Sequence, residues 1–252
     1  MTTATVTHIG FVSPNATWGA HYDDLLALVP DGVQVDIQPL GLYRTSLNEL
    51  SEAGGDHLAK TTQLVAERGW QGVAVTGAPM QVQNRDLPER LRAATGVPVT
   101  TALESSTAAL RALSAERALV LTPFDESMNA LVGEYLRGVG IDAVFPDTAI
   151  GSVPRAVALS ADEVYDLAKG ALMAASGVEA IYFQGARLNP LGCLERMETD
   201  FSVPVVASNP AMLWNLLSLL GIRRPSGEGL GERRPSGVGG RLLREWPALV
   251  DA

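Results

Sequence analysis

The sequence has little cysteine and little positive charge, and both shortages exclude classes of protein. Cys193 is the single cysteine among 252 residues, so the chain cannot form an internal disulfide or hold a metal ion with several thiolates. Asp and Glu number 28 against 19 Lys and Arg, which gives a formal net charge of −9. Nucleic-acid binding depends on Lys and Arg that neutralise phosphates, so we expect no nucleic-acid partner. An anionic small ligand is compatible, because a single pocket can be lined with N–H donors.

Long apolar runs are also missing. No run approaches the roughly 18 residues that a membrane-spanning helix needs, so we expect no membrane association. Residues 1–8 lack the charged and apolar regions of a secretory signal peptide. These absences predict a soluble, cytoplasmic protein. They leave its assembly open, and a homo-oligomer is compatible with them.

The usual signatures of a bound cofactor are absent as well. His8, His21 and His57 stand without metal-ligand spacing or clustered carboxylates, so we expect no metal site. Ser13-Pro14-Asn15 follows the first predicted strand, where a glycine-rich phosphate-binding fingerprint would otherwise stand. The sequence therefore predicts a protein that works without a cofactor.

What the chain does have is a regular alternation of strand and helix signals. Hydrophobic residues make up 46% of it, enough for a sizeable core. Short apolar runs closed by glycine, such as Val73–Ala78 and Ala180–Ala186, predict buried strands that open onto a loop. The predicted strands are 5–12, 33–37, 72–76, 97–101, 117–121, 142–145, 180–184 and 203–207. The predicted helices are 18–28, 46–68, 86–95, 105–113, 126–137, 160–175, 191–199, 209–220 and 241–246. This alternation predicts mainly parallel sheets.

The second half of the chain repeats the order of the first. Gly77 and Gly185 close equivalent strands, and two further pairs of strands stand at nearly the same separation, which indicates an ancient duplication. We therefore predict an α/β fold of two pseudo-symmetric halves, with a ligand cleft between them. The predicted halves are 1–115 and 116–206.

The C-terminal segment is predicted to return to the first half. Residues 207–252 are expected to pack back on that half. Within this segment, 223–240 contains Arg-Arg-Pro-Ser-Gly twice and is rich in glycine. We interpret it as a mobile loop, and the alternative is an ordered lid or an oligomer contact.

Four motifs carry a resemblance to a known family. They are Ile9–Asn15, Val120–Phe124 with Asn129, Tyr135–Ile141, and Pro204–Asn209 with Trp214. With them the chain, from about Thr7 to Ile222, resembles the aspartate/glutamate racemase superfamily, most of all the branch of maleate cis-trans isomerase and arylmalonate decarboxylase. The resemblance implies two pseudo-symmetric halves with the site between them and cofactor-independent chemistry on small dicarboxylic acids.

The chain departs from this family at its reactive side chains. Members commonly place a cysteine after the third strand of each half, but here these positions fall at Ala78 and Gly185. A Thr-Ser pair that typically binds a carboxylate appears as Pro79-Met80, and a typical tyrosine appears as Phe124. Cys193 lies beyond the expected position and is interpreted as a core thiol, with a displaced catalytic residue as the alternative.

Ligands of parallel sheets bind outside the carboxyl ends of the strands, so the candidate site residues follow those ends. The predicted substrate-binding residues are Asn15, Thr17, Thr76, Ala78, Pro79, Met80, Phe124, Gly185, Ala186 and Ser208. Glu104 is the predicted catalytic residue, a general base if its surroundings raise its pKa; capping of a helix N-terminus is the competing interpretation. Arg187 could hold a carboxylate or simply be exposed.

Together these features predict a cofactor-independent isomerase, racemase or decarboxylase that acts on a small, substituted or unsubstituted dicarboxylic acid by chemistry without cysteine. The alternative is a catalytically inactive relative that binds a small carboxylate metabolite. A periplasmic-type binding domain would fit two lobes but not the missing signal peptide.

Overall fold

A computed structural model describes residues 6–17, 19, 21–43, 46–146, 150–223 and 239–250. The chain divides into two compact units. The first comprises residues 1–101 and 216–234, and the second comprises 102–215 and 235–252. Within the described residues, no helix is long and apolar enough to cross a membrane.

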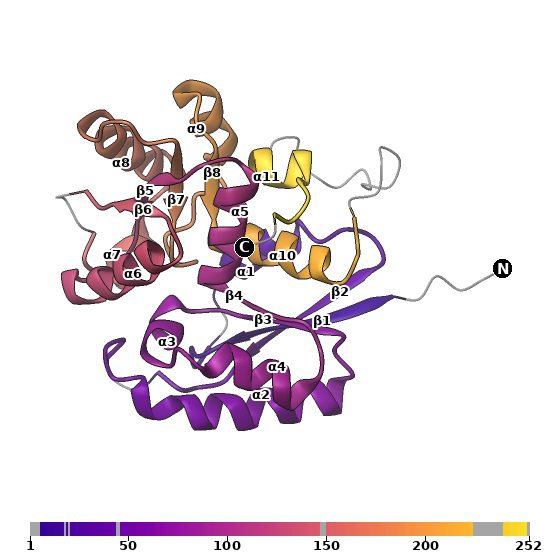
Figure 1. The fold of residues 1–252 in the computed structure, drawn as a ribbon. Helices are drawn as coiled ribbons and strands as arrows, with labels where there is room; N and C mark the ends of the chain where they lie inside the picture. Colours follow the sequence, from indigo (N-terminus) through magenta and orange to yellow (C-terminus); the bar gives the residue numbers. More distant parts are fainter. Residues whose placement is uncertain are drawn as a thin grey trace. The chain divides into compact units, whose positions relative to one another are not determined.

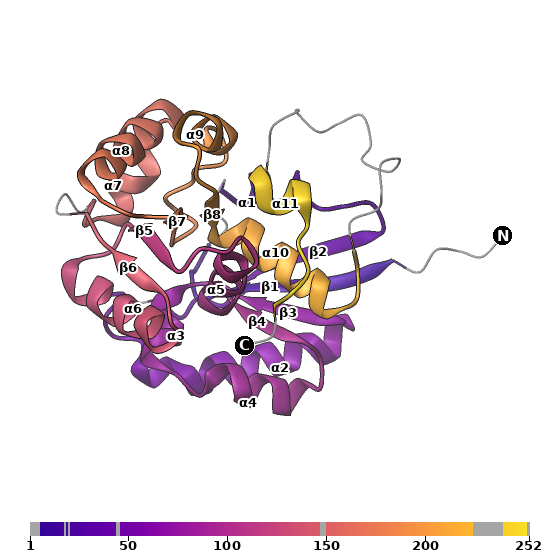
Figure 2. The same ribbon diagram turned by 45° about the horizontal axis from the view of Figure 1, so that its top comes forward.

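The first unit contains a four-stranded parallel sheet in the order β2-β1-β3-β4. Its strands are β1 (Thr7–Ser13), β2 (Val33–Pro39), β3 (Gly72–Val75) and β4 (Val99–Thr101). Its helices are α1 (His21–Leu26), the 3-10 turn η1 (Ser51–Ala53), α2 (Gly54–Arg68), α3 (Ala78–Gln83) and α4 (Leu87–Thr95). Helices α2 and α4 lie side by side against one face of the sheet (Figures 1 and 2). Helices on a parallel sheet bury its strands, which explains their continuous apolar sequences.

The second unit repeats this sheet in the order β6-β5-β7-β8, again all parallel. Its strands are β5 (Arg117–Leu121), β6 (Asp142–Val144), β7 (Ala180–Phe183) and β8 (Val205–Ala207). Its helices are α5 (Ala102–Ala112), α6 (Glu126–Gly138), α7 (Val153–Ala158), α8 (Ala161–Ala174), α9 (Leu194–Phe201), α10 (Ser208–Leu219) and α11 (Gly240–Glu245). The last turn of α10 belongs to the first unit. The matching strand orders confirm the predicted pair of pseudo-symmetric α/β halves.

One predicted helix start is confirmed and another is wrong. The helix predicted at 160–175 starts as expected, because Ser160 and Glu163 form a capping box at the start of α8. The helix predicted from residue 46, by contrast, begins only at Gly54. The Gln83 side chain explains this, because it accepts a hydrogen bond from the Leu50 N–H at 2.9 Å and donates to the Leu47 carbonyl at 2.7 Å. A long-range contact therefore holds this segment outside the helix.

The division into units differs from the predicted boundaries 1–115 and 116–206. Helix α5 belongs to the second unit although it directly follows β4 of the first sheet. The segment 207–252 is divided rather than packed on the first half alone. Leu216 and Leu220 pack over Gly72 of the first sheet.

Helix α11 belongs to the second unit and contacts α9 and β8. The Arg241 N–H at its start donates to the Glu198 carboxylate at 2.7 Å, and that carboxylate also accepts the Val205 N–H at 3.1 Å. Leu242 and Leu243 are buried in this contact region. Of the loop predicted at 223–240, residues 224–238 lie outside the described residues.

Candidate functional site

The turn after β3 is built around a glycine that the backbone requires. Gly77 has φ of 90°, a left-handed conformation that side chains rarely adopt. A Cβ at this position would also lie 3.0 Å from Pro14 Cγ and 3.0 Å from the Tyr43 hydroxyl. Ala78, Pro79 and Met80 follow as the buried first turn of α3. This turn is therefore tightly packed and apolar.

The ends of β1 and β2 meet beside this turn. The Leu42 and Tyr43 N–H groups both donate to the Pro14 carbonyl, at 2.8 and 3.0 Å, and the Gly41 N–H donates to the Asn15 carbonyl at 2.9 Å. The Asn15 side chain is half-buried and donates to the Ser13 hydroxyl at 3.0 Å, whereas Thr17 is exposed. The loop after β2 thus lies against the loop after β1.

Two tyrosines that are not among the predicted site residues lie at this edge of the first sheet. The Tyr22 hydroxyl is 3.4 Å from the Thr76 hydroxyl in a buried position, and the Tyr43 hydroxyl lies against Gly77. The sequence did hold a signal for Tyr43, since it follows the carboxyl end of a predicted strand at 33–37. None of the predicted site residues follows that strand.

In the second unit, the turn after β7 is closed by Ser208. Gly185 has φ of 103°, its N–H donates to the Ser208 hydroxyl at 3.1 Å, and that hydroxyl donates to the Phe183 carbonyl at 3.0 Å. The Gln184 side chain is buried and accepts a hydrogen bond from Tyr182. The Ser208 hydroxyl, which we predicted to bind substrate, is therefore engaged in holding the turn.

We expect Ser208→Ala to lower the free energy of unfolding by about 2 kcal/mol, because the Gly185 N–H and the Phe183 carbonyl both lose their partner. Chemical denaturation followed by circular dichroism measures the change. Ser127→Ala is the matched control, since its hydroxyl is exposed and bonds only Asp125 on the surface. A loss for Ser208→Ala no larger than that of the control would contradict this structural role.

The Thr122-Pro123-Phe124 turn after β5 packs against the turn at Gly185. A Cβ on Gly185 would lie 2.9 Å from Pro123 Cδ and 3.4 Å from Phe124 Cζ. The Thr122 hydroxyl donates to Asn129 at 2.5 Å and accepts the Phe124 N–H at 3.1 Å. The structure thus brings Phe124, Gly185 and Ser208 together. The cavity beside Thr122 measures about 10 Å³, too small for a ligand larger than one water.

Cys193 lies at the N-cap of α9, where its surroundings make it unreactive. Its Sγ donates to the Pro190 carbonyl at 3.4 Å. Burial raises the pKa of the thiol to about 11, against the smaller opposing effect of Arg196. Only the thiolate is a nucleophile, so this thiol is inert at neutral pH. The interpretation as a core residue fits this position better than a displaced catalytic residue.

The two charged candidates, Glu104 and Arg187, lie in different segments of the second unit. Glu104 is in the first turn of α5 and is half-buried. Arg187 is half-buried and follows the Gly185 turn, as does Ala186. Their roles stay predictions. Among the described residues, no group of three His, Cys, Asp or Glu side chains is placed to hold a metal ion.

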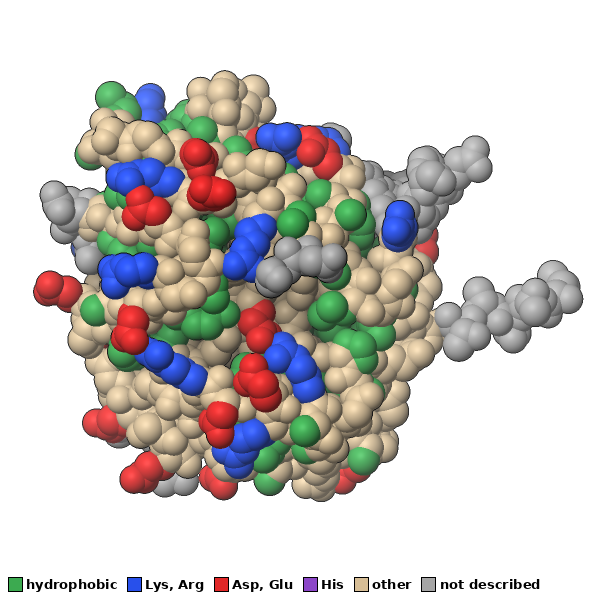
Figure 3. Space-filling view, viewed as in Figure 1, with side chains coloured by type: hydrophobic (Ala, Val, Ile, Leu, Met, Phe, Trp, Pro, Cys, Tyr) green, Lys and Arg blue, Asp and Glu red, His purple; other side chains and the backbone are tan. Residues whose placement is uncertain are grey.

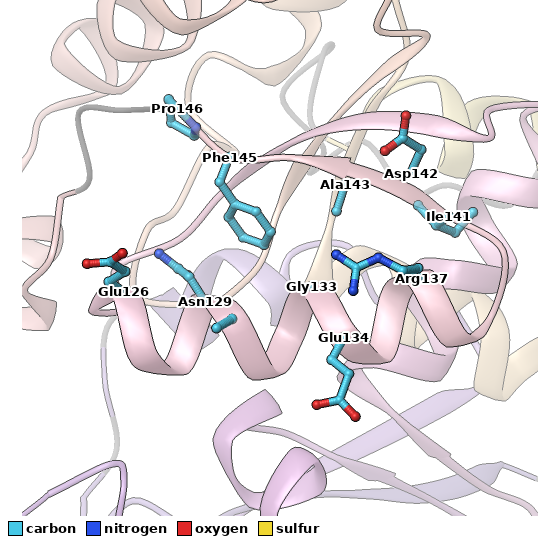
Figure 4. Close-up of a pocket in the computed structure, with 11 residues that line it drawn as sticks. Glu126, Asn129, Gly133, Glu134, Arg137, Ile141, Asp142, Ala143, Phe145 and Pro146 are labelled. Carbon is cyan, nitrogen blue, oxygen red and sulfur yellow. The ribbon is translucent and has the colours of Figure 1, made fainter.

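A groove of about 780 Å³ runs between α6 and β6 of the second unit (Figure 4). Phe145 points toward the helix, where Gly133 leaves room for its ring. Glu126, Glu134, Arg137 and Asp142 are the charged residues among those that line it. The Arg137 guanidinium lies between the helix and the strand, whereas the carboxylates of Glu134 and Asp142 point away from that space (Figure 4). On the face drawn in Figure 3, the described Lys and Arg side chains lie interspersed with Asp and Glu.

Comparison with known proteins places these features in a family. A model of the arylmalonate decarboxylase family matches residues 9–231. Arylmalonate decarboxylase from Bordetella bronchiseptica is 29% identical over 148 residues. That match covers 55% of this chain and 58% of the relative, so it spans little more than half of the relative's length.

Solved structures share the fold, among them the following two. Unliganded arylmalonate decarboxylase has a TM-score of 0.76 at 24% identity, covering 95% of this chain and 99% of that one. A maleate cis-trans isomerase from Nocardia farcinica, solved with a covalently bound succinylcysteine intermediate, has a TM-score of 0.75 at 18% identity. It covers 95% of this chain and 98% of that one.

Proposed function

Because the chain belongs to the arylmalonate decarboxylase family, we propose that it is a cofactor-independent enzyme that acts on a small dicarboxylic acid without using a cysteine. The observation that supports a reaction without cysteine is the lack of a reactive thiol. Neither Ala78 nor Gly185 offers one, and Cys193 is buried with its pKa raised to about 11. Cysteine-based covalent or proton-transfer chemistry therefore has no suitable group in this chain.

Decarboxylation of a substituted malonate is the reaction that we favour among those of the family. Ala78, Pro79, Met80 and Phe124 are buried and apolar at the ends of their strands. A carboxylate placed among apolar groups loses its hydration, which destabilises it relative to carbon dioxide. Apolar groups also suit an aryl or alkyl substituent on the central carbon.

Substrate binding in this proposal uses the polar groups that remain. The Asn15 amide, the Thr76 hydroxyl and the backbone N–H groups beside Ala78 and Ala186 are the candidates to hold the second carboxylate. Thr17, Pro79 and Phe124 are proposed to contact the rest of the substrate. Met80, also predicted to do so, is 0% exposed and lies in the core cluster beneath the turn, so it is proposed to support the pocket from behind. Gly185 and Ser208, which bond each other, are proposed to shape the pocket rather than to donate to the ligand.

The second candidate function is binding of a small carboxylate without turnover. The observation that favours it is that polar groups of the second unit bond one another, namely Ser208 with Gly185 and Thr122 with Asn129. Such a protein would retain the fold and lack a reactive group.

Incubation with 2-methyl-2-phenylmalonate, maleate and aspartate tests these proposals. We expect release of carbon dioxide from the malonate, and equal release by Cys193→Ala, because this thiol is inert. Thermal unfolding with each acid is measured in parallel. Stabilisation without turnover would favour the binding protein. If no acid is turned over and none stabilises the protein, both candidate functions are excluded. Loss of turnover in a folded Cys193→Ala variant would show that the thiol takes part.

A further inference from the structure

We infer that the Tyr43 hydroxyl is the proton donor of the proposed reaction. The inference rests on the proposed function and names the group that completes it. Decarboxylation leaves a carbanion that must receive a proton, and the chain offers no reactive thiol for this step. A tyrosine O–H is one of the side chains that enzymes use as a general acid.

The position of the Tyr43 hydroxyl is the first reason. It lies at the carboxyl end of the first sheet, where ligands of parallel sheets bind. A Cβ on Gly77 would be 3.0 Å from this oxygen, so the hydroxyl touches the turn that Thr76, Gly77 and Ala78 form. The proton of the Tyr43 hydroxyl therefore lies next to the residues that we propose to hold the substrate.

The way in which Tyr43 is held is the second reason. Its own N–H and that of Leu42 both donate to the Pro14 carbonyl, and Leu42 is buried. Part of the Tyr43 ring packs against the core cluster that contains Val12, Val75 and Met80. A ring anchored by its backbone and by packing presents its hydroxyl in a fixed place, which general acid catalysis requires.

Comparison with Tyr22 is the third reason. Tyr22 is the other tyrosine whose hydroxyl reaches this turn, 3.4 Å from Thr76, but it is only 1% exposed. Tyr43 is half-buried, so more of this residue than of Tyr22 is open to solvent. A general acid that is used in every turnover must meet the ligand and regain its proton from solvent, and Tyr43 is the better placed of the two for both.

The substrate of the proposed step is a disubstituted malonate dianion. The bond between the central carbon and one carboxylate breaks, carbon dioxide leaves, and the electron pair stays on the central carbon. That carbon takes the proton of the Tyr43 hydroxyl, which gives the monocarboxylate and a tyrosinate. Solvent water then returns a proton to the tyrosinate, so the enzyme regains its starting form.

Tyr43→Phe tests the inference with 2-methyl-2-phenylmalonate as the probe. We expect kcat to fall at least about 100-fold while KM changes less than about threefold, because the ring stays and only the proton is removed. The alkaline limb of the wild-type pH profile should be missing from the residual activity. Tyr165→Phe is the matched control, since its hydroxyl bonds Asp200 on the second unit, and it should keep kcat within about twofold.

The outcomes separate the inference from the proposed function. Wild-type turnover with an unchanged Tyr43→Phe variant, or a loss confined to Tyr22→Phe, would overturn the role of Tyr43 and leave the proposed function standing. Absence of wild-type turnover with every acid would overturn both. If Tyr43→Phe does not fold, fluorotyrosine incorporated at position 43 replaces it, because a more acidic hydroxyl must move the alkaline limb to lower pH. An unmoved limb would refute the inference.

Discussion

Replacing Gly10 with alanine is expected to lower the free energy of unfolding by about 3 kcal/mol, or to prevent folding. Gly10 lies in the middle of β1, paired with Asp36 of β2 and Val73 of β3. The Trp70 ring covers it, and an added Cβ would come within 2.3 Å of Trp70 Cε3. Trp70 is only 2% exposed, and its Nε1 donates to Asp36 at 2.9 Å, so the ring cannot move aside without losing that bond and its packing.

Two further variants test whether the Trp70 ring is what excludes a side chain at position 10. Urea unfolding measures the free energies of unfolding of Gly10→Ala, Trp70→Leu and the double variant. The double variant should be at least about 1 kcal/mol more stable than the sum of the two single losses predicts. Gly138→Ala is the control, since nothing lies within 4 Å of a Cβ at the end of α6, and its stability should be unchanged or slightly raised. Strictly additive losses would mean that Trp70 is not what excludes a side chain at position 10.

The second large effect is a loss of stability in mild acid that comes from His57. This residue of α2 is 0% exposed, and its Nδ1 lies 3.2 Å from the Thr61 hydroxyl. Burial lowers the pKa of the imidazole to about 4 from an ordinary value of 6.5, against a smaller opposing effect of a backbone hydrogen bond. Protonation of the unfolded chain therefore begins at a higher pH than protonation of the folded one.

The direction of the pH effect follows from this order. Between pH 6.5 and pH 4 the unfolded state binds the proton and the folded state does not, so stability is complete above pH 6.5 and falls as the pH drops. The full difference amounts to about 3 kcal/mol, of which about 2 kcal/mol is lost by pH 5. Urea unfolding at pH 7.5 and pH 5 measures it. His57→Leu removes the titrating group, so the variant should lose about 2 kcal/mol less over that interval than the wild type. Equal losses in the two proteins would assign the acid sensitivity to carboxylates instead.

The local features of the fold could be predicted from the sequence because they depend on residues close together in the chain. Apolar runs closed by glycine marked the strands, and the repeat of Gly77 at Gly185 indicated two equivalent halves, as the two sheets confirm. The capping box at Ser160 is an example of a signal contained within four residues. That neither position 78 nor position 185 carries a thiol is likewise read directly from the sequence.

Long-range contacts decided what the sequence could not show. The helix predicted from residue 46 begins only at Gly54, because Gln83, 33 positions beyond Leu50, holds the preceding segment outside the helix. Ser208 resembled a ligand-binding residue, but its hydroxyl bonds Gly185 and Phe183. Side-chain oxygens choose among partners that only the folded chain brings near, so a motif cannot reveal which partner they take.

The sequence by itself thus determined the two α/β halves, the family and the presence of a single cysteine, because periodicity and residue identity are local properties. The tertiary structure alone decided that Cys193 is buried against Pro190, that Ser208 closes a turn, and that the Tyr43 hydroxyl reaches Gly77. Each of these depends on distances between segments that lie far apart in the chain, and the packing of a folded core sets such distances.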